Sequence, residues 1–580
     1  MDSASPPDSA SWPAEYDVVV VGSGAGGMAA ALTASIEGLS VLLVEKFDRI
    51  GGSTAVSGGA VWIPGNAQSA AAGHPDTDDR IWRYMRAVVG DAAPADMQRA
   101  FLRAGPEAID YLQRNTALKL AARTYSPDYY PDRDGASLGG RSLDPMMFDG
   151  RELGDSFALL RDPLAEFVVL GGMMVTVTDV RHLLAATRSF SSWKEAMKLV
   201  LRFWGDRLSG FHRGTRLVLG NALAARLFRS VLDRKIPFWL STPLQSLIRD
   251  ADGRVAGVEL LRDGRSMRVR ARRGVVLACG GFPWDREQRT QLYPQPTGPW
   301  SMSPAENSGD GIRAAQQAGG TLGPEGSSPA FWAPVSIRKR PDGSEVRYPH
   351  LVWDRAKPGL MAVNAAGARF VNESTSYHEF VLGMYRSHQT TPTFPAFLVC
   401  DNDFIERWGL GLALPGGRPR EHLVRDGYLF RADSLAELAA QMGIDAAGLE
   451  TSAERFNRAA ESGRDEDFGK GSTLYNQYLG DPDLKTNPCL GPLRRAPFWG
   501  VKVYAGDIGT ARGILCNGNA QALDPSGRVI PGLYAAGNDM QSVMGGEYPA
   551  PGITLGPALT FGWVAGRHLA GHSVAGAAST

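Results

Sequence analysis

The stretch YDVVVVGSGAGGMAAALTASIEGLSVLLVEK, residues 16–46, constrains the fold more than any other part of the chain. Its apolar run VVVV is typical of a strand buried on both faces of a sheet. The glycines of GSGAGG follow in GxGxxG spacing, and an alanine-rich segment, a second apolar run and Glu45 come next. This order of strand, turn, helix, strand and acid predicts a dinucleotide-binding unit.

The physical requirements of a bound dinucleotide explain the spacing. Gly22 makes the tight turn, Gly24 lets the backbone approach a pyrophosphate, and Gly27 allows the helix to pack closely. The N-terminus of the helix carries the partial positive charge that a phosphate prefers. Glu45 can accept hydrogen bonds from ribose hydroxyls.

The length and composition of the chain set broader limits. At 580 residues it exceeds the size at which one hydrophobic core keeps growing, so two or more domains are expected. The 61 basic residues balance the 61 acidic residues, which argues against a broad nucleic-acid-binding surface. The four cysteines stand far apart without zinc or iron–sulfur spacing, so no metal site is expected.

The N-terminal segment MDSASPPDSASWPAEYD is acidic and rich in Pro and Ser. It has neither the basic nor the apolar region of a signal peptide. No apolar run in the chain reaches the roughly 18 residues that a membrane span needs. We therefore expect a cytoplasmic protein with a disordered leader over residues 1–15.

Five later segments are expected to complete the dinucleotide-binding unit. The segment 214–260 predicts a helix followed by strands that are joined by a turn at Gly253. GGSTAVSGG (51–59) offers small residues and hydroxyls that suit a loop along a flavin or its phosphates. GVVLACGGF (274–282) and GLYAAGND (532–539) predict buried strands that end in glycine turns, and the segment 552–571 predicts a closing helix. A C-terminal strand that completes an N-terminal Rossmann unit indicates an FAD protein with an inserted domain.

From Tyr16 to about His568 the chain resembles the fumarate reductase/succinate dehydrogenase flavoprotein superfamily and, within it, the 3-ketosteroid Δ1-dehydrogenases. The resemblance implies an α/β fold: a Rossmann-type FAD-binding domain assembled from N- and C-terminal segments, with an inserted α+β substrate-capping domain. The implied FAD-binding domain covers 16–324 and 504–580, and the capping domain covers 325–503. Non-covalent FAD is the implied cofactor.

By the same resemblance, the FAD phosphates lie on the glycine-rich turn, the ribose lies on Glu45, and the isoalloxazine lies near the hydroxyls of 53–57. A helix N-terminus near residue 554 would stabilise negative charge on the reduced flavin. The residues expected to contact FAD are Gly22, Gly24, Ala25, Gly26, Gly27, Glu45, Lys46, Gly52, Ser53, Thr54, Ser57, Gly58, Gly59, Leu244, Gly280, Gly281, Gly537, Asn538, Thr554 and Leu555.

The stretch RFVNESTSYHEF, residues 369–380, separates this chain from the fumarate-reducing members. Those members carry an arginine proton donor where this chain has Tyr377. They also carry a histidine and a second arginine that clamp dicarboxylates, where this chain reads AGDIGTARGIL and SVMGG. A fumarate-type substrate is therefore not expected.

Three motifs resemble the steroid dehydrogenases instead. NESTSY places Tyr377, GGEYPAPGITLGPA places Tyr548 and Gly552, and YSPDYYPD (125–132) places Tyr129. The repeated tyrosines of the last motif leave Tyr125 and Tyr130 as close rivals of Tyr129.

The resemblance implies a 1,2-desaturation of 3-ketosteroids in steroid or sterol degradation. The Tyr548 hydroxyl and the Gly552 N–H would stabilise enolate charge on the ketone oxygen. Tyr377 would take the carbon 2 proton, which an arginine cannot do because it stays protonated in proteins, while carbon 1 passes a hydride to flavin N5. A phenol titrates near pH ~10, so a hydrogen bond from Tyr129 is expected to lower the pKa of Tyr377 and to leave an alkaline optimum.

Other functions stay open from the sequence. The alternatives are a 3-ketosteroid 4(5)-dehydrogenase, a flavin-dependent enoate reductase of the fumarate or urocanate type, and a flavin-binding protein without turnover. The expected partners are a 3-ketosteroid and an external electron acceptor, such as a quinone or a dye. His378, beside Tyr377, could act as a base at its ordinary pKa, but we expect it to be structural.

Residues 160–213 are expected to be an insertion that contains an amphipathic helix over 191–210. The helix either contacts a membrane peripherally to collect a lipid-like substrate, or packs on the protein's own body or on another subunit. Its apolar stripe is Trp193, Ala196, Met197, Val200, Leu201, Trp204 and Leu208, and its basic stripe is Lys194, Lys198 and Arg202.

Overall fold

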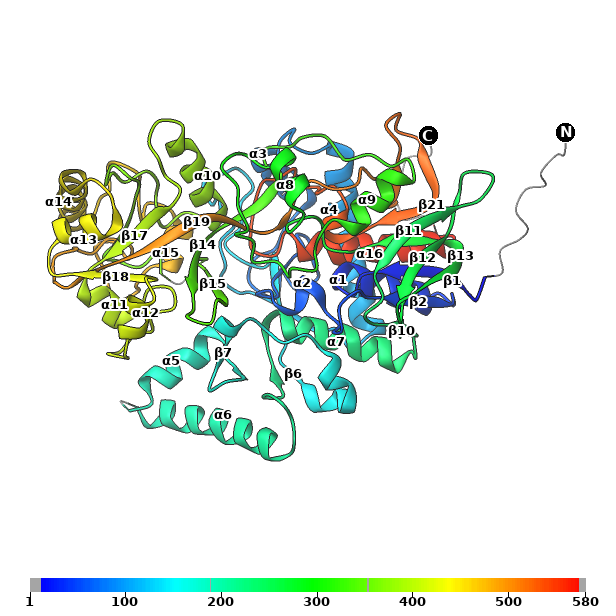
Figure 1. Cartoon of the computed structure of the whole chain (residues 1–580), viewed down its shortest axis with the longest axis horizontal. Helices are drawn as coiled ribbons and strands as arrows, with labels where there is room; N and C mark the ends of the chain where they lie inside the picture. The colour runs from blue at the N-terminus through cyan, green and yellow to red at the C-terminus, as the bar shows by residue number, and fades with distance from the viewer. Residues whose placement is uncertain (1–11, 188, 352–353, 573–580) are drawn as a thin grey trace.

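A computed structural model of the chain describes residues 12–187, 189–351 and 354–572. Its larger sheet has the strand order β10-β2-β1-β13-β12-β11, and β21 pairs with the C-terminal half of β13 (Figure 1). Strands β10, β2, β1, β13 and β21 are parallel. The bounds are β1 Ala14–Val21, β2 Val41–Val44, β10 Phe238–Trp239, β11 Leu244–Arg249, β12 Val255–Arg262, β13 Arg265–Leu277, β20 Gln521–Leu523 and β21 Val529–Ala535.

The two ends of the chain meet in this sheet. Val19 of β1 is in register with Val275 of β13, which is in register with Leu533 of β21, and all three side chains are buried. Parallel strands need crossover connections, and helices supply them. The helices of this part are α1 Ala25–Ile36, α2 Gly52–Ala55, α3 Asp78–Val88, α4 Ala95–Asn115, α7 Leu219–Asp233, α8 Arg286–Leu292, α9 Asp310–Gln317 and α16 Leu555–Leu569.

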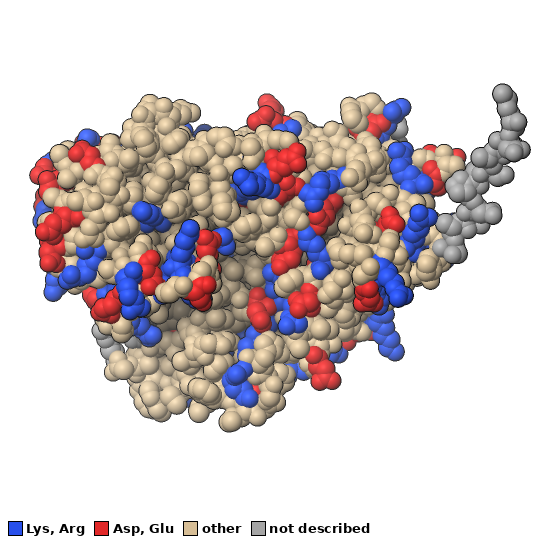
Figure 2. All heavy atoms as spheres, viewed as in Figure 1, with Lys and Arg blue, Asp and Glu red and all other residues tan. Residues whose placement is uncertain are grey.

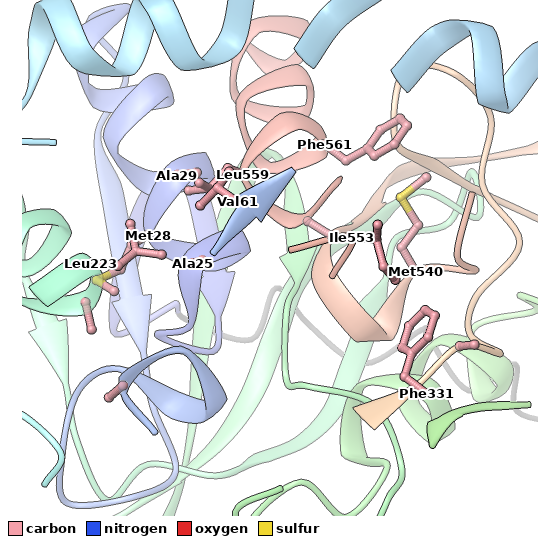
Figure 3. Packing of buried hydrophobic residues seen from close by; sticks show 14 of the residues in the cluster. Ala25, Met28, Ala29, Val61, Leu223, Phe331, Met540, Ile553, Leu559 and Phe561 are labelled. Atoms are coloured by element: carbon pink, nitrogen blue, oxygen red, sulfur yellow. The ribbon is translucent and has the colours of Figure 1, made fainter. Parts of the chain in front are cut away.

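Helices α1 and α16 pack closely because both have glycine where they touch. A Cβ on Gly562 would overlap the carbonyl oxygen of Gly26. Figure 3 shows Ala29 of α1 and Leu559 of α16 in the core that the two helices share. This packing brings the N-termini of both helices to the edge of one cavity.

The second sheet is antiparallel, with the order β15-β14-β19-β17-β16 and with β18 paired to β19. Alternate residues of β17 face opposite sides, as a strand requires: Phe397 and Val399 pack with α13 and α14, and Leu398 packs in the large core. The bounds are β14 Ala330–Lys339, β15 Glu345–Pro349, β16 Leu360–Val363, β17 Ala396–Cys400, β18 Leu429–Ala432, β19 Phe498–Thr510, α10 Tyr377–His388, α11 Asn402–Trp408, α12 Glu421–Arg425, α13 Leu435–Met442, α14 Ala446–Ser462 and α15 Leu474–Leu479.

Smaller elements lie outside the two sheets. A three-stranded sheet with the order β3-β5-β4 contacts α16 through β3 and α7 through β5. The segment that carries β6, β7, α5 and α6 forms the lower projection in Figure 1. The bounds are β3 Val61–Trp62, β4 Leu120–Ala122, β5 Ser142–Pro145, β6 Phe148–Asp149, η1 Gly150–Leu159, η2 Ala165–Phe167, β7 Val168–Val169, β8 Met173–Met174, α5 Val177–Ala185, α6 Phe190–Leu208, β9 Arg216–Leu217 and η3 Gly537–Asp539.

Helix α6 divides the predicted apolar stripe between two faces. Ala196 is buried together with Phe203, whereas Trp193, Leu201, Trp204 and Leu208 are 48%, 64%, 53% and 87% exposed. The predicted basic stripe also changes, because the Arg202 guanidinium pairs with Asp149 at 3.0 Å.

Two strands extend across boundaries that we expected from the sequence. Strand β1 begins at Ala14, inside the segment expected as a disordered leader, and residues 1–11 of that segment lie outside the described residues. Strand β19 runs without interruption across the expected domain boundary at 503 and ends at Thr510. Within the described residues, no helix combines the length and the apolar character needed to span a membrane.

Candidate active site

A cavity of about 340 Å³ lies where the two sheets approach each other. Its walls come from the C-terminal ends of β1 and β13, from the N-termini of α1 and α16, and from the second sheet through Pro349, Leu351 and Ile508. The volume is in the range of small-molecule sites. The C-terminal ends of parallel strands are also where ligands bind in open α/β sheets.

The residues expected to contact FAD line this cavity with two exceptions, and we call the part that they form the dinucleotide end. Gly27 and Gly281 are the exceptions, because they do not line it. Gly27 has a packing role, since a Cβ there would overlap the carbonyl oxygen of Gly22. The expected residues that line the cavity are Gly22, Gly24, Ala25, Gly26, Glu45, Lys46, Gly52, Ser53, Thr54, Ser57, Gly58, Gly59, Leu244, Gly280, Gly537, Asn538, Thr554 and Leu555.

The backbone of the turn after β1 fits a dinucleotide. Gly22 has φ +107°, and a Cβ there would overlap the Ala278 carbonyl, so this turn requires glycine. The Glu45 carboxylate accepts hydrogen bonds from the Ser23 N–H at 3.0 Å and the Ser23 hydroxyl at 2.7 Å, which hold it at the cavity edge. The Ala25 N–H, the first of α1, donates to the Thr54 hydroxyl at 2.9 Å. The N–H groups that follow it in the first turn have no partner within the helix, so they can bind a pyrophosphate. These residues would hold FAD.

Three phenols that contact one another also line the cavity, and we call this part the phenol end. The Tyr129 hydroxyl donates a hydrogen bond of 3.0 Å to the Tyr377 hydroxyl. The Tyr129 and Tyr548 rings stack with centroids 5.5 Å apart, and the Tyr377 ring stands edge-on to Tyr548 at 5.1 Å. The Tyr129 N–H also donates to the Pro549 carbonyl at 2.8 Å, which fixes Tyr129 beside the residue that follows Tyr548.

Burial dominates the acidity of this cluster. It raises the pKa of Tyr377 well above its ordinary value, and the neighbouring phenols Tyr129 and Tyr548 raise it further. Burial also raises the pKa values of Tyr129 and Tyr548. The expectation that a hydrogen bond from Tyr129 lowers the pKa of Tyr377 is therefore wrong, because the net shift of this pKa is upward.

Tyr548 and Gly552 lie on the wall next to these phenols, and both line the cavity. Gly552 has φ +101°, and a Cβ there would lie 2.6 Å from the Trp62 nitrogen. Its N–H donates to no acceptor in the part of the chain that the structure describes, whereas its carbonyl accepts from the Trp62 N–H at 3.1 Å. The geometry leaves a backbone donor free for a ligand oxygen.

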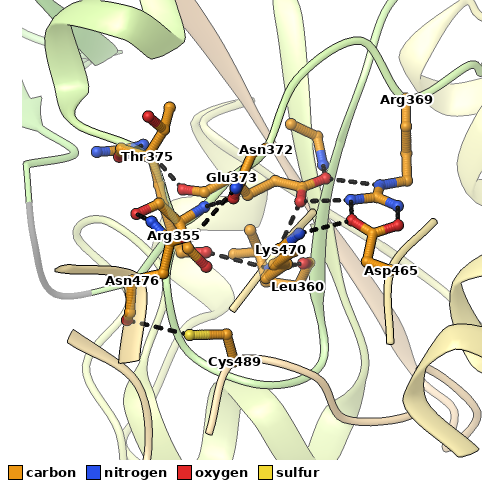
Figure 4. A network of polar contacts seen from close by, with 12 residues as sticks. Arg355, Leu360, Arg369, Asn372, Glu373, Thr375, Asp465, Lys470, Asn476 and Cys489 are labelled. Carbon is orange, nitrogen blue, oxygen red and sulfur yellow. Dashed lines mark hydrogen bonds and ion pairs between the residues drawn. The ribbon is translucent and has the colours of Figure 1, made fainter. Parts of the chain in front are cut away.

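A buried polar network supports the turn that leads to Tyr377 (Figure 4). Glu373 binds Arg369 at 2.8 Å and lies 3.7 Å from Lys470. Arg369 also pairs with Asp465 at 2.9 Å. The NE pair of the sequence motif thus holds a turn in place rather than contacting the cavity.

The structure separates the three rival tyrosines. Tyr129 lines the cavity, the Tyr130 hydroxyl donates to Glu379 at 2.9 Å, and Tyr125 is 45% exposed. His378 is fully buried, and its Nδ1 accepts from the Trp332 N–H at 3.2 Å. Burial lowers the pKa of His378 to about 3, so it is a neutral structural group.

Several cavity residues escaped the sequence analysis. Arg123 and Arg161 line the cavity, and each is ion-paired, to Asp144 at 2.7 Å and to Glu306 at 2.6 Å. Leu164 and Phe167 reach the cavity from the insertion, and no motif marks them. A fourth phenol, Tyr475, packs its ring 4.7 Å from that of Tyr129.

Comparisons with known proteins identify the family to which the chain is similar. Residues 17–555 match the model of a family described as "FAD binding domain". A 4-oxocyclohex-2-ene-1-carboxylate 5-dehydrogenase from Sinomonas cyclohexanicum is 38% identical, over 96% of this chain and 93% of that protein. A 3-oxosteroid 1-dehydrogenase from Mycolicibacterium smegmatis is 37% identical, over 97% of this chain and 98% of that protein.

A solved structure is similar along the whole chain. The 3-ketosteroid Δ1-dehydrogenase from Sterolibacterium denitrificans, solved in complex with 1,4-androstadiene-3,17-dione, is 40% identical with a TM-score of 0.90. The match covers 96% of this chain and 99% of that one.

Proposed function

Because the chain belongs to the FAD-binding flavoprotein family that includes the 3-oxosteroid 1-dehydrogenases, we propose that it desaturates carbons 1 and 2 of a 3-ketosteroid. The protein is an FAD-dependent oxidoreductase that acts on CH–CH bonds. The observation that carries the specific reaction is the meeting of three phenols and the free Gly552 N–H in one cavity.

Each group at the phenol end has a distinct task in the proposed reaction. The Tyr548 hydroxyl and the Gly552 N–H bind the ketone oxygen and stabilise the negative charge that develops there. Tyr377 accepts the proton from carbon 2, which the polarised ketone makes acidic, and Tyr129 donates a hydrogen bond to the Tyr377 oxygen. Bound FAD supplies the acceptor for the hydride that leaves carbon 1.

The charges around the cavity support a neutral substrate over a carboxylate. Each Lys and Arg that lines the cavity has a carboxylate within 4.0 Å. The carboxylate of a substrate such as a cyclohexenone carboxylate would have to compete for these cations with the protein carboxylates that already pair with them. A neutral steroid would not. The 4(5)-dehydrogenation of a 3-ketosteroid remains the second candidate, because the same groups can polarise the same ketone.

An anaerobic titration tests the proposed reaction. Holoprotein is mixed with 4-androstene-3,17-dione or with 4-oxocyclohex-2-ene-1-carboxylate while flavin absorbance is followed. We expect bleaching with the steroid and formation of the 1,4-dien-3-one. Bleaching with the carboxylate alone would contradict the steroid assignment, and a product without the carbon 1–2 double bond would favour the second candidate.

We also propose that α6 docks on a lipid surface. Phe190, Trp193, Leu201, Trp204 and Leu208 form one outward-facing stripe, all between 48% and 87% exposed. Figure 2 shows few charged groups over this lower projection.

The cations of α6 and the link between the insertion and the cavity favour a lipid surface over a second copy of the chain as the binding partner of α6. Lys194 and Lys198 are exposed beside the stripe, as in helices that bind anionic interfaces. The same insertion contributes Leu164 and Phe167 to the cavity, so an apolar substrate or a quinone acceptor could reach the cavity from the lipid.

Vesicle sedimentation tests this docking. Full-length protein should sediment with phosphatidylcholine–phosphatidylglycerol vesicles, and the double variant Leu201→Glu/Leu208→Glu should remain in the supernatant while it keeps turnover. Leu414→Glu changes a leucine that is 53% exposed in the second-sheet region, so it is a matched control. A dimer that disappears in the double variant, with no vesicle binding by the parent protein, would contradict lipid docking.

A further inference from the structure

Arg355 buries a full positive charge behind the phenols. Only 1% of Arg355 is exposed to solvent. Among the described residues, no carboxylate lies within 4.0 Å of its guanidinium. The adjacent Asp354 binds His350 at 2.5 Å and the Arg355 backbone N–H at 2.9 Å. Burying an arginine costs several kcal/mol, so a position that retains one needs an explanation.

The guanidinium is bound entirely to backbone carbonyls of two segments. On one side it donates to the His350 and Leu351 carbonyls, each at 2.7 Å. On the other side it donates to the Glu373 carbonyl at 2.9 Å and the Thr375 carbonyl at 3.1 Å. One side chain therefore ties a wall of the cavity, through Leu351, to the turn before Tyr377.

This turn fixes where the phenol of Tyr377 lies. Thr375 precedes Ser376, whose hydroxyl caps α10 by accepting from the Glu379 N–H at 3.2 Å, and Tyr377 is the first residue of the helix. The Arg355 guanidinium also lies 5.0 Å from the centre of the Phe380 ring on the first turn of α10. A shift of this turn would move the Tyr377 oxygen away from a bound substrate, and small misplacements cost large factors in rate.

The charge of Arg355 also faces the phenols. Its electrostatic neighbours are Tyr475 on α15, Asp354 on its own segment, Tyr129 and Glu373. Glu373 is held by Arg369 and Lys470, and Asp354 by His350, so each carboxylate has a closer cation or donor. Tyr475 and Tyr129 are therefore the neutral groups beside this positive charge. Arg355 acts to lower the pKa of Tyr475, and the cavity cation Arg123 acts in the same direction on Tyr129, which is bonded to Tyr377.

We propose that Arg355 is a positioning residue for the base: it holds the turn before Tyr377 against the cavity wall and places a positive charge behind the phenols, which favours their anionic form. This inference rests on the proposed function, in which Tyr377 takes a proton. It adds a residue outside the cavity that determines both where the base lies and how readily it forms.

Comparison of a neutral and a charged variant separates the two roles. Arg355→Met removes the charge and the four hydrogen bonds, whereas Arg355→Lys keeps the charge and loses the planar guanidinium. We expect both variants to bind FAD and to lose kcat/KM for the steroid. Arg355→Met should lose at least tenfold more than Arg355→Lys at every pH below the pKa of Tyr377, because each unit by which the missing charge raises that pKa lowers the anionic fraction about tenfold.

Three outcomes would overturn the inference. The first is a folded, FAD-loaded Arg355→Met variant with the parent kcat/KM at every pH. The second is the same pH-independent loss in both variants, which a structural role alone would produce. If Arg355→Met does not fold, Arg355→Gln, which keeps two N–H donors, replaces it. The third outcome is that neither neutral variant folds, because Arg355 would then have only a role in folding. If the parent protein itself fails to bleach with 3-ketosteroids, the proposed function is wrong instead.

Discussion

The two ends of the cavity are built in opposite ways. The dinucleotide end comes mainly from one continuous stretch, and its contacts are backbone groups and small residues such as Gly22 and Gly24. The phenol end joins Tyr129, Tyr377 and Tyr548, which come from three distant segments, and apart from the Gly552 N–H its functional groups are side chains. The first end depends mainly on small residues, and the second depends mainly on single hydroxyl groups.

This difference predicts separable losses. Damage to the dinucleotide end should remove the cofactor and with it all activity. Damage to the phenol end should leave a yellow protein that no longer turns over. The predictions below follow this division from the largest expected effect to the smallest.

Gly22→Ala should have the largest effect. The added Cβ overlaps the Ala278 carbonyl at a backbone φ of +107°, where alanine is strained. We expect protein without bound flavin and without measurable turnover, checked by the visible spectrum after purification. Gly38→Ala is a partial control, because its φ is also positive (+87°) but a Cβ there meets nothing within 4 Å. A yellow, active Gly22→Ala protein would show that this turn does not determine cofactor binding.

Tyr377→Phe should lose about 10²–10⁴-fold in kcat, the usual contribution of a general base. Flavin content should stay at the parent level, because the ring remains and only a hydroxyl is removed. Steady-state kinetics and the flavin spectrum check both expectations. Tyr130→Phe is the matched control, since the Tyr130 hydroxyl binds Glu379 outside the phenol cluster. Near-normal turnover by Tyr377→Phe would exclude it as the base.

Tyr548→Phe should lose about 10²–10³-fold in kcat, as for removal of one donor to a developing oxyanion. The Gly552 N–H still binds the ketone in this variant, so a remnant of activity should persist. Binding of the dienone product, measured by perturbation of the flavin spectrum, should weaken as well. Unchanged product binding together with an unchanged kcat would remove Tyr548 from the ketone site.

The smallest effect that we predict is a rise of the activity of the parent enzyme with pH. Burial raises the pKa of Tyr377 above that of a free phenol, so only a small fraction is anionic near neutrality. Below that pKa the anionic fraction grows about tenfold per pH unit, and kcat/KM should follow without a plateau in the neutral range. A plateau between pH 6 and 8 would indicate a different base.

Much of the dinucleotide end could be predicted because its signal is local. GxGxxG, the flanking apolar runs and Glu45 lie within 31 consecutive residues, 16–46. The phenol end was accessible only through motifs that resemble known relatives. Even then, the sequence did not separate Tyr129 from Tyr125 and Tyr130. Which of them belongs to the site depends on a contact with Tyr377, 248 residues away from Tyr129.

Other features had no local signal at all. Arg355 resembles any surface arginine in the sequence, and its role depends on four carbonyls from two segments. The net direction of the Tyr377 pKa was predicted incorrectly because burial is a tertiary property. The stripe on α6 was visible as a pattern, but helical periodicity cannot tell which apolar residues face the body.

The sequence by itself determined a nucleotide-binding α/β unit with an inserted domain, because turn geometry and strand burial are encoded in neighbouring residues. Only the tertiary structure decided which phenols meet, which buried cation lies behind them and which face of α6 is exposed. Those properties depend on distances between segments that the folded core brings together, and no spacing along the chain records them.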